Sequence, residues 1–458
     1  MTSFLVRFKK GNMQKSMIEG NTLKLILNFS IPLLLGNLFQ QFYNVVDAAI
    51  VGQTLGSKAL AAVGASSSVQ FLILGFCMGI CQGFAIMVSQ SYGAKRPDEM
   101  LTYIYAGAVW TAITAFVVSI FVVVFCADIL HILQVNDEIF NDAYAYLVVI
   151  FLGIPFTLLY NYLSAILRAI GDSKTPFFFL AFSAFLNIGL DFFCILVLKW
   201  GCAGAAIATI FAQAVSGILC LLLIAFKVNI LHIPKSSRYV DKQHSLKLLA
   251  VGVPMGLQFS ITAIGSMVMQ SANNDLGTIY VSGFTAGMRI KSLMMCPFDA
   301  LGAAVSTFLS QNYGACKLER IQDGYHKGVM VSILYGAFAC VVMVFFGRIL
   351  SMMFVSANES QVLNASALYL RRMGYFYPVL GILITTRMSV QGLGYSARAM
   401  LAGFVEMIAR CIVALCFVPI FKYGAITWAD QTAWVAATLV LIPLWISAMR
   451  TVQKNELN

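Results

Sequence analysis

PLLLGNLFQQFYNVVDAAIVG, residues 32–52, is an apolar stretch that contains one acid, Asp47. The surrounding residues are mostly Leu, Ile, Val, Phe and Ala, which predicts a helix in lipid or in a bundle embedded in lipid. An ionised carboxylate in such a helix is unfavourable by roughly 2.5–3.5 kcal/mol on insertion scales. A membrane helix keeps such an acid where it faces a watery cavity, a partner or an ion. We therefore expect the rest of the chain to be organised around Asp47.

The composition is that of a polytopic membrane protein. Of the 458 residues, 60% are hydrophobic and 11% are charged, whereas a globular chain carries about 25% charged residues. A helix needs about 20 apolar residues to cross the hydrocarbon layer. Windows of that length predict an all-α fold with twelve membrane helices, near residues 24–50, 60–88, 100–127, 140–168, 174–198, 202–226, 244–272, 280–310, 327–353, 367–392, 398–421 and 428–450.

The net charge of +11 is explained by topology and not by nucleic-acid binding. If the N-terminus lies in the cytoplasm, twenty Lys and Arg residues between the spans fall on the cytoplasmic side. Six fall on the other side: Lys58, Lys199, Arg348, Arg371, Arg372 and Lys422. This bias follows the positive-inside rule. It predicts a multi-pass protein of the cell membrane with both termini in the cytoplasm, and no nucleic-acid partner.

The sequence repeats itself once. SQSYGAK (residues 89–95) recurs as SQNYGAC (residues 310–316), 221 residues later, and KWG (199–201) recurs as KYG (422–424). Because each half holds six spans, the halves share one orientation, as in transporters built from parallel repeats. We therefore predict two pseudo-symmetric six-helix lobes. The expected division is a cytoplasmic tail (1–23), an N-lobe (24–226), a cytoplasmic linker (227–243), a C-lobe (244–450) and a C-terminal tail (451–458).

Four polar residues within the N-lobe spans predict a cation site: Asp47, Asn187, Asp191 and Thr209. Asn187 and Asp191 are four residues apart and therefore share one helix face. Together the four would offer oxygen ligands, which a hard cation such as sodium prefers. The two acids could instead share a proton. The alternative for Asn187 and Thr209 is an ordinary hydrogen bond between helices.

Other polar or helix-breaking residues carry further expectations. Pro32 removes a backbone hydrogen bond, so the first helix can bend there during transport, or the kink can be static. Gln40 and Tyr43 precede Asp47 by about two turns and one turn, and we expect them to line a ligand cavity. In the C-lobe we expect structural ion pairs, one between Glu406 and Arg410 and one between Asp299 and either Arg289 or Lys291.

The chain resembles the multidrug and toxic compound extrusion (MATE) family, prokaryotic type. The resemblance rests on IPLLLGNLFQQFYNVVDAAIVG (31–52), LGSKALAAVGASS (55–67), the two SQ-Y-G-A motifs and LRAIGDSKTP (167–176), and it covers about residues 24–450. It implies two six-helix lobes in an outward-open V. It also implies efflux of amphipathic, often cationic drugs or metabolites in exchange for sodium ions or protons, by alternating access.

The resemblance also implies roles for single residues. Prokaryotic members have a cation site whose residue types match Asp47, Asn187, Asp191 and Thr209. The family's bending proline matches Pro32, and residues near its bound ligands match Gln40 and Tyr43. Some branches have functional acids in the seventh and tenth helices, but those spans have no central acid here, so a second ion site of that type is not expected.

Two alternatives lie outside drug efflux. A lipid-linked oligosaccharide flippase of the same superfamily would be expected to present basic residues to a pyrophosphate, whereas the N-lobe interior presents acids. A membrane-embedded enzyme would need a catalytic motif, and the sequence has no paired His motif, nucleophile elbow or phosphate-binding loop. We therefore expect a monomeric transporter without enzymatic activity or a cofactor, whose partners are the substrate, a monovalent cation and the bilayer.

Overall fold

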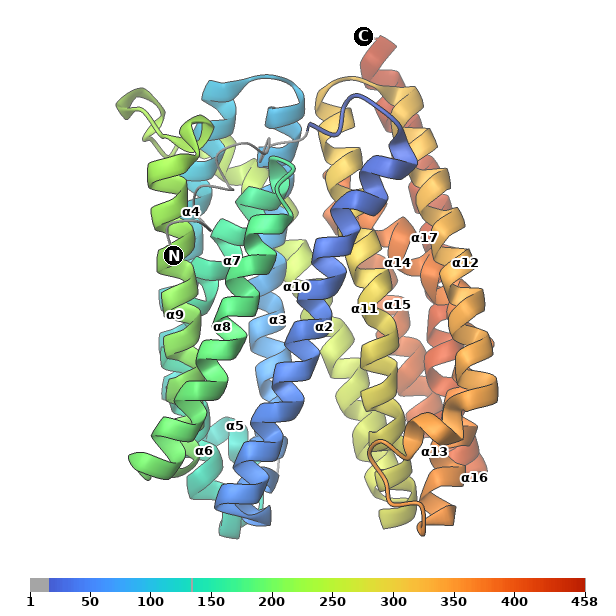
Figure 1. Cartoon of the computed structure of the whole chain (residues 1–458). Helices are drawn as coiled ribbons and strands as arrows, with labels where there is room; N and C mark the ends of the chain where they lie inside the picture. Colours follow the sequence, from blue (N-terminus) through green and yellow to red (C-terminus); the bar gives the residue numbers. More distant parts are fainter. Residues whose placement is uncertain (1–15, 133–134, 458) are drawn as a thin grey trace.

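The computed structural model describes residues 16–132 and 135–457, and these residues form helices joined by short connections (Figure 1). Two groups of helices stand side by side and confirm the expected all-α, two-lobed fold. Residues 228–241 connect them and contain two short 3-10 turns, Asn229–Leu231 and Lys235–Ser237. We call the end of the molecule where α2 begins and α17 ends the terminal end.

The helices of the N-lobe are α2 (Thr22–Leu55), α3 (Ser57–Gly93), α4 (Pro97–Val124), α5 (Cys126–Ile132), α6 (Asp137–Leu152), α7 (Ile154–Ala169), α8 (Lys174–Phe192) with the π-helical turn η1 (Phe193–Val197), and α9 (Gly201–Lys227). The helices of the C-lobe are α10 (Lys242–Asn274), α11 (Thr278–Gly314), α12 (Leu318–Ser351), α13 (Ser360–Gly374), α14 (Tyr377–Gly392), α15 (Ser396–Ile412) with the π-helical turn η4 (Val413–Phe417), α16 (Val418–Phe421) and α17 (Tyr423–Leu457).

Within the described residues, ten helices are long and apolar enough to cross a membrane. The bent pair α6 and α7, which meet at 47°, makes an eleventh span. The pair α13 and α14 occupies the equivalent position in the second repeat, and it is interrupted before Pro378 as α6 and α7 are interrupted before Pro155. Proline favours the first turn of a helix and removes a backbone hydrogen bond to the preceding turn, so both breaks fall where a proline favours them.

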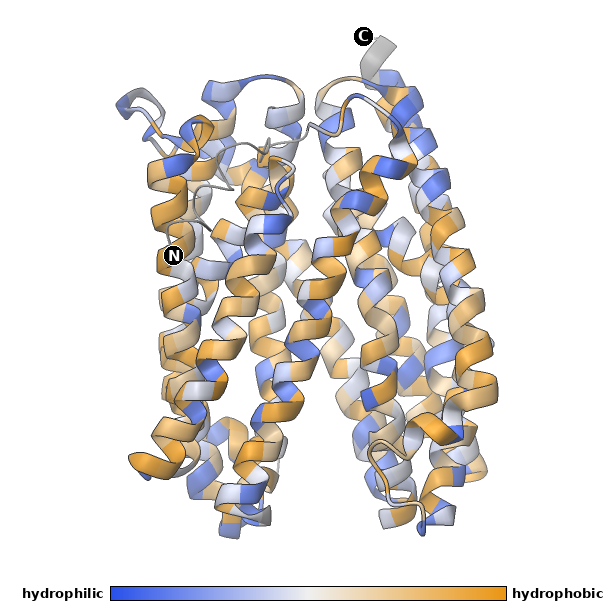
Figure 2. Cartoon of the chain, viewed as in Figure 1, coloured by the Kyte–Doolittle hydropathy of each residue, from blue (hydrophilic) through white to orange (hydrophobic). Residues whose placement is uncertain are grey.

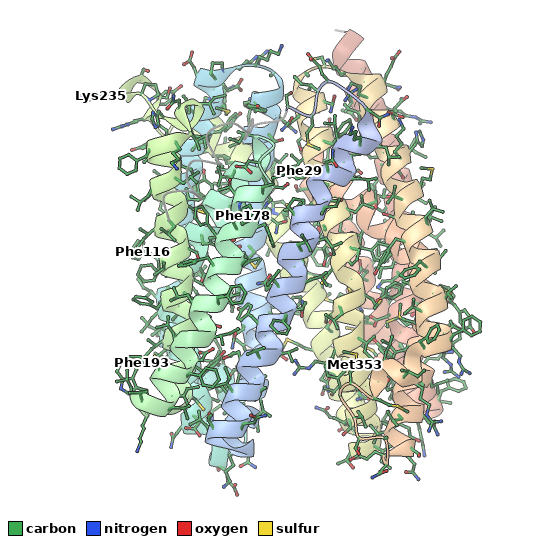
Figure 3. All side chains as sticks on the ribbon, in the orientation of Figure 1. Phe29, Phe116, Phe178, Phe193, Lys235 and Met353 are labelled. Carbon is green, nitrogen blue, oxygen red and sulfur yellow. The ribbon has the colours of Figure 1, made fainter. Side chains whose placement is uncertain are left out.

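Hydrophobic residues predominate along the helices of both lobes (Figure 2), and many large apolar side chains are exposed. Exposed aromatic side chains such as Phe116 and Phe193, which are 61% and 49% exposed, project from the N-lobe (Figure 3). Single exposed apolar residues are ordinary on soluble proteins, but a continuous apolar surface of this extent requires lipid around it.

The buried apolar residues form two clusters, one per lobe, and α2 contributes to both. Ile50 and Val51, near its C-terminal end, belong to the N-lobe cluster. Ile26 and Phe29, near its N-terminal end, belong to the C-lobe cluster. The helix therefore crosses from one lobe to the other (Figure 1). Pro32, which is buried, lies between these two anchored ends.

The lobes pack closely where α3 crosses α10. A Cβ atom added to Gly79 would lie 2.7 Å from the Cα of Gly256. A Cβ atom on Gly83 would lie 2.5 Å from the Cα of Gly252. Small residues allow membrane helices to pack backbone to backbone, and these glycines explain the tight crossing.

Candidate functional site

The four side chains expected to bind a cation come together in the N-lobe. Asp47 comes from α2, Asn187 and Asp191 from one face of α8, and Thr209 from α9. Asp191 is completely buried and Asn187 is 2% exposed. The amide Nδ2 of Asn187 donates to Thr209 Oγ1 at 3.4 Å. The carboxyl groups of Asp47 and Asp191 lie near enough to each other to interact electrostatically.

Four oxygens of this cluster are buried without hydrogen-bond partners in the described part of the chain. They are Asp47 Oδ1, Asn187 Oδ1 and both carboxylate oxygens of Asp191. Within the described part of the chain, no ion pair joins Asp47 or Asp191 to a Lys, Arg or His side chain. Burying unpartnered polar groups is costly. The arrangement therefore suits a species that brings positive charge, either a cation held by these oxygens or a proton shared between the carboxylates.

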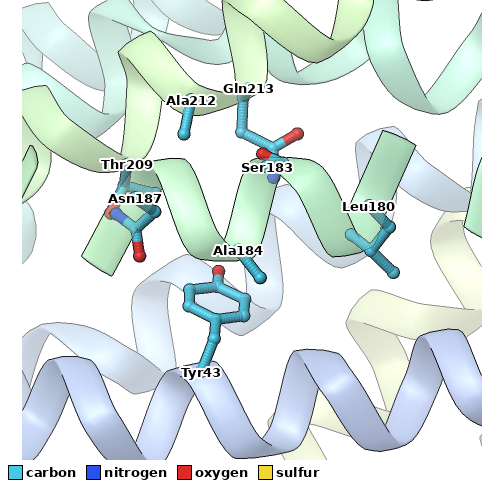
Figure 4. Close-up of a pocket in the computed structure, with 8 residues that line it drawn as sticks. All are labelled: Tyr43, Leu180, Ser183, Ala184, Asn187, Thr209, Ala212 and Gln213. Atoms are coloured by element: carbon cyan, nitrogen blue, oxygen red, sulfur yellow. The ribbon is translucent and has the colours of Figure 1, made fainter. Parts of the chain in front are cut away.

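A small cavity beside the cluster is lined by residues of α2, α8 and α9 (Figure 4). It holds about 10 Å³, and its lining includes Tyr43, Asn187, Thr209 and Gln213. This volume is on the scale of one water molecule. Gln213 Oε1 is buried there without a hydrogen-bond partner, so it adds another oxygen to the polar set. The sequence reasoning did not select Gln213, although it lies four residues after Thr209 on the same helix.

The helix α8 changes geometry directly after the cluster. It passes into the π-helical turn η1 at Phe193, two residues after Asp191. The C-lobe has the matching turn η4, which begins three residues after Arg410. π-helical turns are rare in proteins overall. Those that occur are often found at functional sites, because they break the regular hydrogen-bond ladder of the helix.

The structure places the expected cavity residues in different surroundings. Tyr43 lines the small cavity beside the cation cluster. Gln41, and not Gln40, contributes to a second and much larger cavity. Gln40 is half-buried on α2. The assignment of Gln40 and Tyr43 to the substrate path stays a prediction.

We call this larger cavity the chamber. It has a volume of about 620 Å³, within the range of roughly 300–1,000 Å³ that ligand pockets occupy. Most of its wall comes from the C-lobe, and the N-lobe adds residues of α2 and α3. Its apolar wall contains Phe71, Phe259, Ala263, Met267, Phe284, Met288, Met295, Leu380, Leu383, Ile384, Met388 and Trp434. Methionine and aromatic side chains adapt to ligands of different shapes.

A charged network lies behind one wall of the chamber and is centred on Asp430 of α17. Asp430 Oδ2 accepts from Lys291 Nζ at 2.6 Å and from the hydroxyl of Tyr369 at 2.8 Å. Its Oδ1 accepts from Arg410 Nε at 3.1 Å. One carboxylate on α17 thereby holds side chains of α11, α13 and α15.

Glu406 extends this network. The expected pair between Glu406 and Arg410 is confirmed, at 3.5 Å, and Glu406 also pairs with Arg387. The expected pairing of Asp299 with Arg289 or Lys291 is wrong, because Lys291 reaches across to Asp430 instead. The sequence reasoning missed Asp430, which lies at the edge of the predicted span 428–450.

Asp299 is the exception among the charged residues that line the chamber. Its side chain is exposed to the chamber. Arg387 is near enough to interact with it through space. Within residues 16–132 and 135–457, however, no ion pair or hydrogen bond of the Asp299 carboxylate is formed. The chamber therefore presents one free acid next to its methionines.

Comparison with known proteins places the chain in context. The MatE family profile matches residues 32–193 and 254–416, one match in each lobe. The chain is 32% identical, over 90% of both chains, to the probable multidrug resistance protein YpnP of Bacillus subtilis. It is 27% identical to the probable multidrug resistance protein YoeA of the same organism, over 72% of this chain and 73% of the relative. A crystal structure of MATE in complex with MaL6 superimposes with a TM-score of 0.89 at 20% identity, over 96% of this chain and 99% of the other.

Proposed function

Because the chain belongs to the MatE (multidrug and toxic compound extrusion) family, we propose that it exports amphipathic, often cationic compounds in exchange for sodium ions or protons. The observation that supports ion coupling is the pair of half-buried Asp47 and completely buried Asp191, which no Lys, Arg or His side chain of the described residues neutralises. A fixed structural pair would have a basic partner, as Asp430 has in the C-lobe. A cation site that empties and refills in each transport cycle has no such fixed basic partner.

The two cavities suggest a division of tasks between the lobes. The small N-lobe cavity has room for an ion or a water molecule, and the chamber has room for an organic substrate. In the proposed cycle, substrate enters the chamber when the terminal end, taken as cytoplasmic, is open. The lobes then rock so that the chamber opens to the other side. A cation that enters there binds Asp47 and Asp191, and substrate leaves.

Movement of α2 would link these events. Pro32 cannot donate a backbone hydrogen bond, so the turn around it resists bending less than a regular helical turn does. Asp47 lies on the same helix, beyond Pro32 as seen from the terminal end. Charge neutralisation at Asp47 would let that part of α2 repack against α8, where Phe39 already contacts Phe177 and Phe185.

The charges around the chamber favour drug export over pyrophosphate transport. Its three bases, Lys291, Arg387 and Arg410, are offset by Glu406, Asp430 and Asp299. A flippase for a lipid-linked pyrophosphate would need an excess of positive charge to hold two phosphates. With Asp430 of the network behind the wall included, the described charges carry no such excess.

The coupling is tested in everted membrane vesicles that accumulate a fluorescent dye cation. A tenfold ion gradient supplies about 1.4 kcal/mol per ion, and 100 mV supplies about 2.3 kcal/mol per net charge moved. The sodium gradient and the pH gradient are collapsed separately, each by its own ionophore. We expect dye uptake to stop when the gradient of the coupling ion is lost and to continue when the other gradient is lost. Vesicles without the protein give the background. Uptake that survives the loss of both gradients would contradict antiport.

The free acid of the chamber leads to a prediction about substrate charge. Asp299→Asn is expected to lower export of a monovalent aromatic cation by about tenfold or more, because one charge-assisted contact is worth roughly 1.5–3 kcal/mol. Export of an uncharged amphipathic compound is expected to change less than twofold. Initial rates in vesicles measure both. Asp275→Asn, an exposed acid after α10, is the control. An equal loss of export rate for both compounds would show that Asp299 does not distinguish substrates by their charge.

A further inference from the structure

The repeated motif of residues 89–95 and 310–316 forms the contact between the lobes at the terminal end. The helix α3 ends at Gly93 and α11 ends at Gly314. A Cβ atom on Gly93 would overlap the backbone carbonyl of Gln311, and a Cβ atom on Gly314 would overlap the carbonyl of Gln90. Each glycine thus packs against the glutamine of the other copy. Any side chain at either glycine would force the two helix ends apart.

The same two glutamines also reach across with their side chains. Gln90 Nε2 donates to the carbonyl of Gly392 in the C-lobe at 3.1 Å. Gln311 Nε2 donates to the carbonyl of Ala169 in the N-lobe at 2.9 Å. Ala169 ends α7 and Gly392 ends α14, so they are equivalent positions of the two repeats. The lobes therefore hold each other by a reciprocal pair of hydrogen bonds.

One half of this contact is reinforced by the chain before α2. The backbone N–H of Met17 donates to Gln311 Oε1 at 2.8 Å. Arg320 Nη2 donates to the carbonyl of Met17 at 3.1 Å, and Lys317 Nζ donates to the carbonyl of Ile18 at 2.9 Å. Met17 is 1% exposed. Within the described residues, Gln90 Oε1 accepts no corresponding backbone hydrogen bond. The two halves of the contact are therefore unequal.

We propose that Gln90, Gln311, Gly93 and Gly314 form a latch that holds the terminal end closed, with one hydrogen bond between the lobes from each glutamine. In the cycle proposed above, substrate reaches the chamber from the terminal end only after these helix ends separate. Amide hydrogen bonds suit such a contact because water replaces them on opening, so the net free energy of each is only about 1 kcal/mol. The glycines ensure that the helix ends meet closely enough for both side chains to reach their partners.

Distances between two spin labels test the latch without any transport assay. Lys95→Cys and the native Cys316 are equivalent exposed positions beside the two glycines. The other accessible cysteines, Cys340, Cys411 and Cys416, are replaced by Ser. In the closed protein the labels give a short distance, and opening lengthens it. The measurement is made in detergent without substrate, so it succeeds or fails independently of the exporter assignment.

We expect Gly93→Ala and Gly314→Ala to shift the distances to the long, open population. Gln90→Ala, which removes one hydrogen bond, is expected to raise the open-to-closed ratio about fivefold. Gln311→Ala likewise removes one hydrogen bond between the lobes. Because its contact with Met17 lies within the C-lobe cluster, the same increase of about fivefold is expected. The glutamine variants add no atoms that would clash with neighbouring backbone. They therefore test whether the contact holds the terminal end closed even if the glycine variants do not fold. Gly64→Ala, on α3 with open space around its Cβ position, is the control. Glycine and glutamine variants that match this control would overturn the latch.

Discussion

Asp191→Asn is expected to abolish ion-driven export while leaving the protein folded. Asp191 is completely buried, and its carboxylate has no basic partner in the described chain. The amide keeps the shape of the side chain but removes the charge that would bind the coupling ion. A charge-assisted contact is worth up to about 3 kcal/mol, so ion binding should weaken on the order of a hundredfold. Dye uptake into everted vesicles, with either gradient imposed, measures the loss.

Stability separates this functional role from a structural one. A buried charge without a partner destabilises a fold, so Asp191→Asn should leave the thermal midpoint in detergent unchanged or raised. Asp47→Asn should act in the same way, and the double variant should be no worse than either single variant, because both acids serve one site. Asp98→Asn, an exposed acid in the first turn of α4, is the matched control. Undiminished export by folded Asp191→Asn would remove the acid from the mechanism.

Asp430→Asn is expected to lower the stability of the protein strongly, in contrast to Asp191→Asn. Asp430 binds Lys291, Arg410 and Tyr369. Removal of its charge leaves two buried bases with less compensation, and breaking a buried pair costs about 3–5 kcal/mol. For a lobe of this size we expect the thermal midpoint to fall by about 10 °C. Fluorescence-detected size-exclusion chromatography after heating measures it.

Two further variants show whether the loss comes from unpaired charge. Asp323→Asn breaks an ion pair with Lys327 whose acid is 41% exposed, and an exposed pair contributes less than about 1 kcal/mol. The addition of Lys291→Met to Asp430→Asn removes one of the stranded bases and should recover part of the loss. An Asp430→Asn variant as stable as Asp323→Asn would mean that the network contributes nothing to the fold.

The sequence was sufficient for the architecture and for the residues of the N-lobe cluster. Hydrophobic windows located the helices, and the copies at residues 89–95 and 310–316 located the internal repeat. Asp47 and Asp191 stood out because acids in apolar helices are rare. The spacing of Asn187 and Asp191 placed both on one face of α8. The structure brings these residues and Thr209 together, and their role in ion coupling stays a proposal.

The C-lobe was less predictable because its pairs join helices that are distant in sequence. Asp430 and Lys291 are on α17 and α11, and no spacing rule relates them. Asp430 also lies near a helix end, where a carboxylate is ordinarily solvated. A count of charges could have indicated Asp430. Lys291, Arg387 and Arg410 outnumber Glu406 and Asp299, so a third acid is needed to balance the three bases. The chamber itself depends on how helices pack, which local sequence does not encode.

The path of α2 through both hydrophobic cores has a mechanical consequence. Its start is buried with Phe29 in one lobe, and its far part, next to Asp47, is buried with Val51 in the other. Neither end can shift without displacing the core that encloses it. In the proposed cycle, ion binding near Asp47 would therefore act on both lobes through α2, and Pro32, the proline inside this helix, is where we expect the helix to bend.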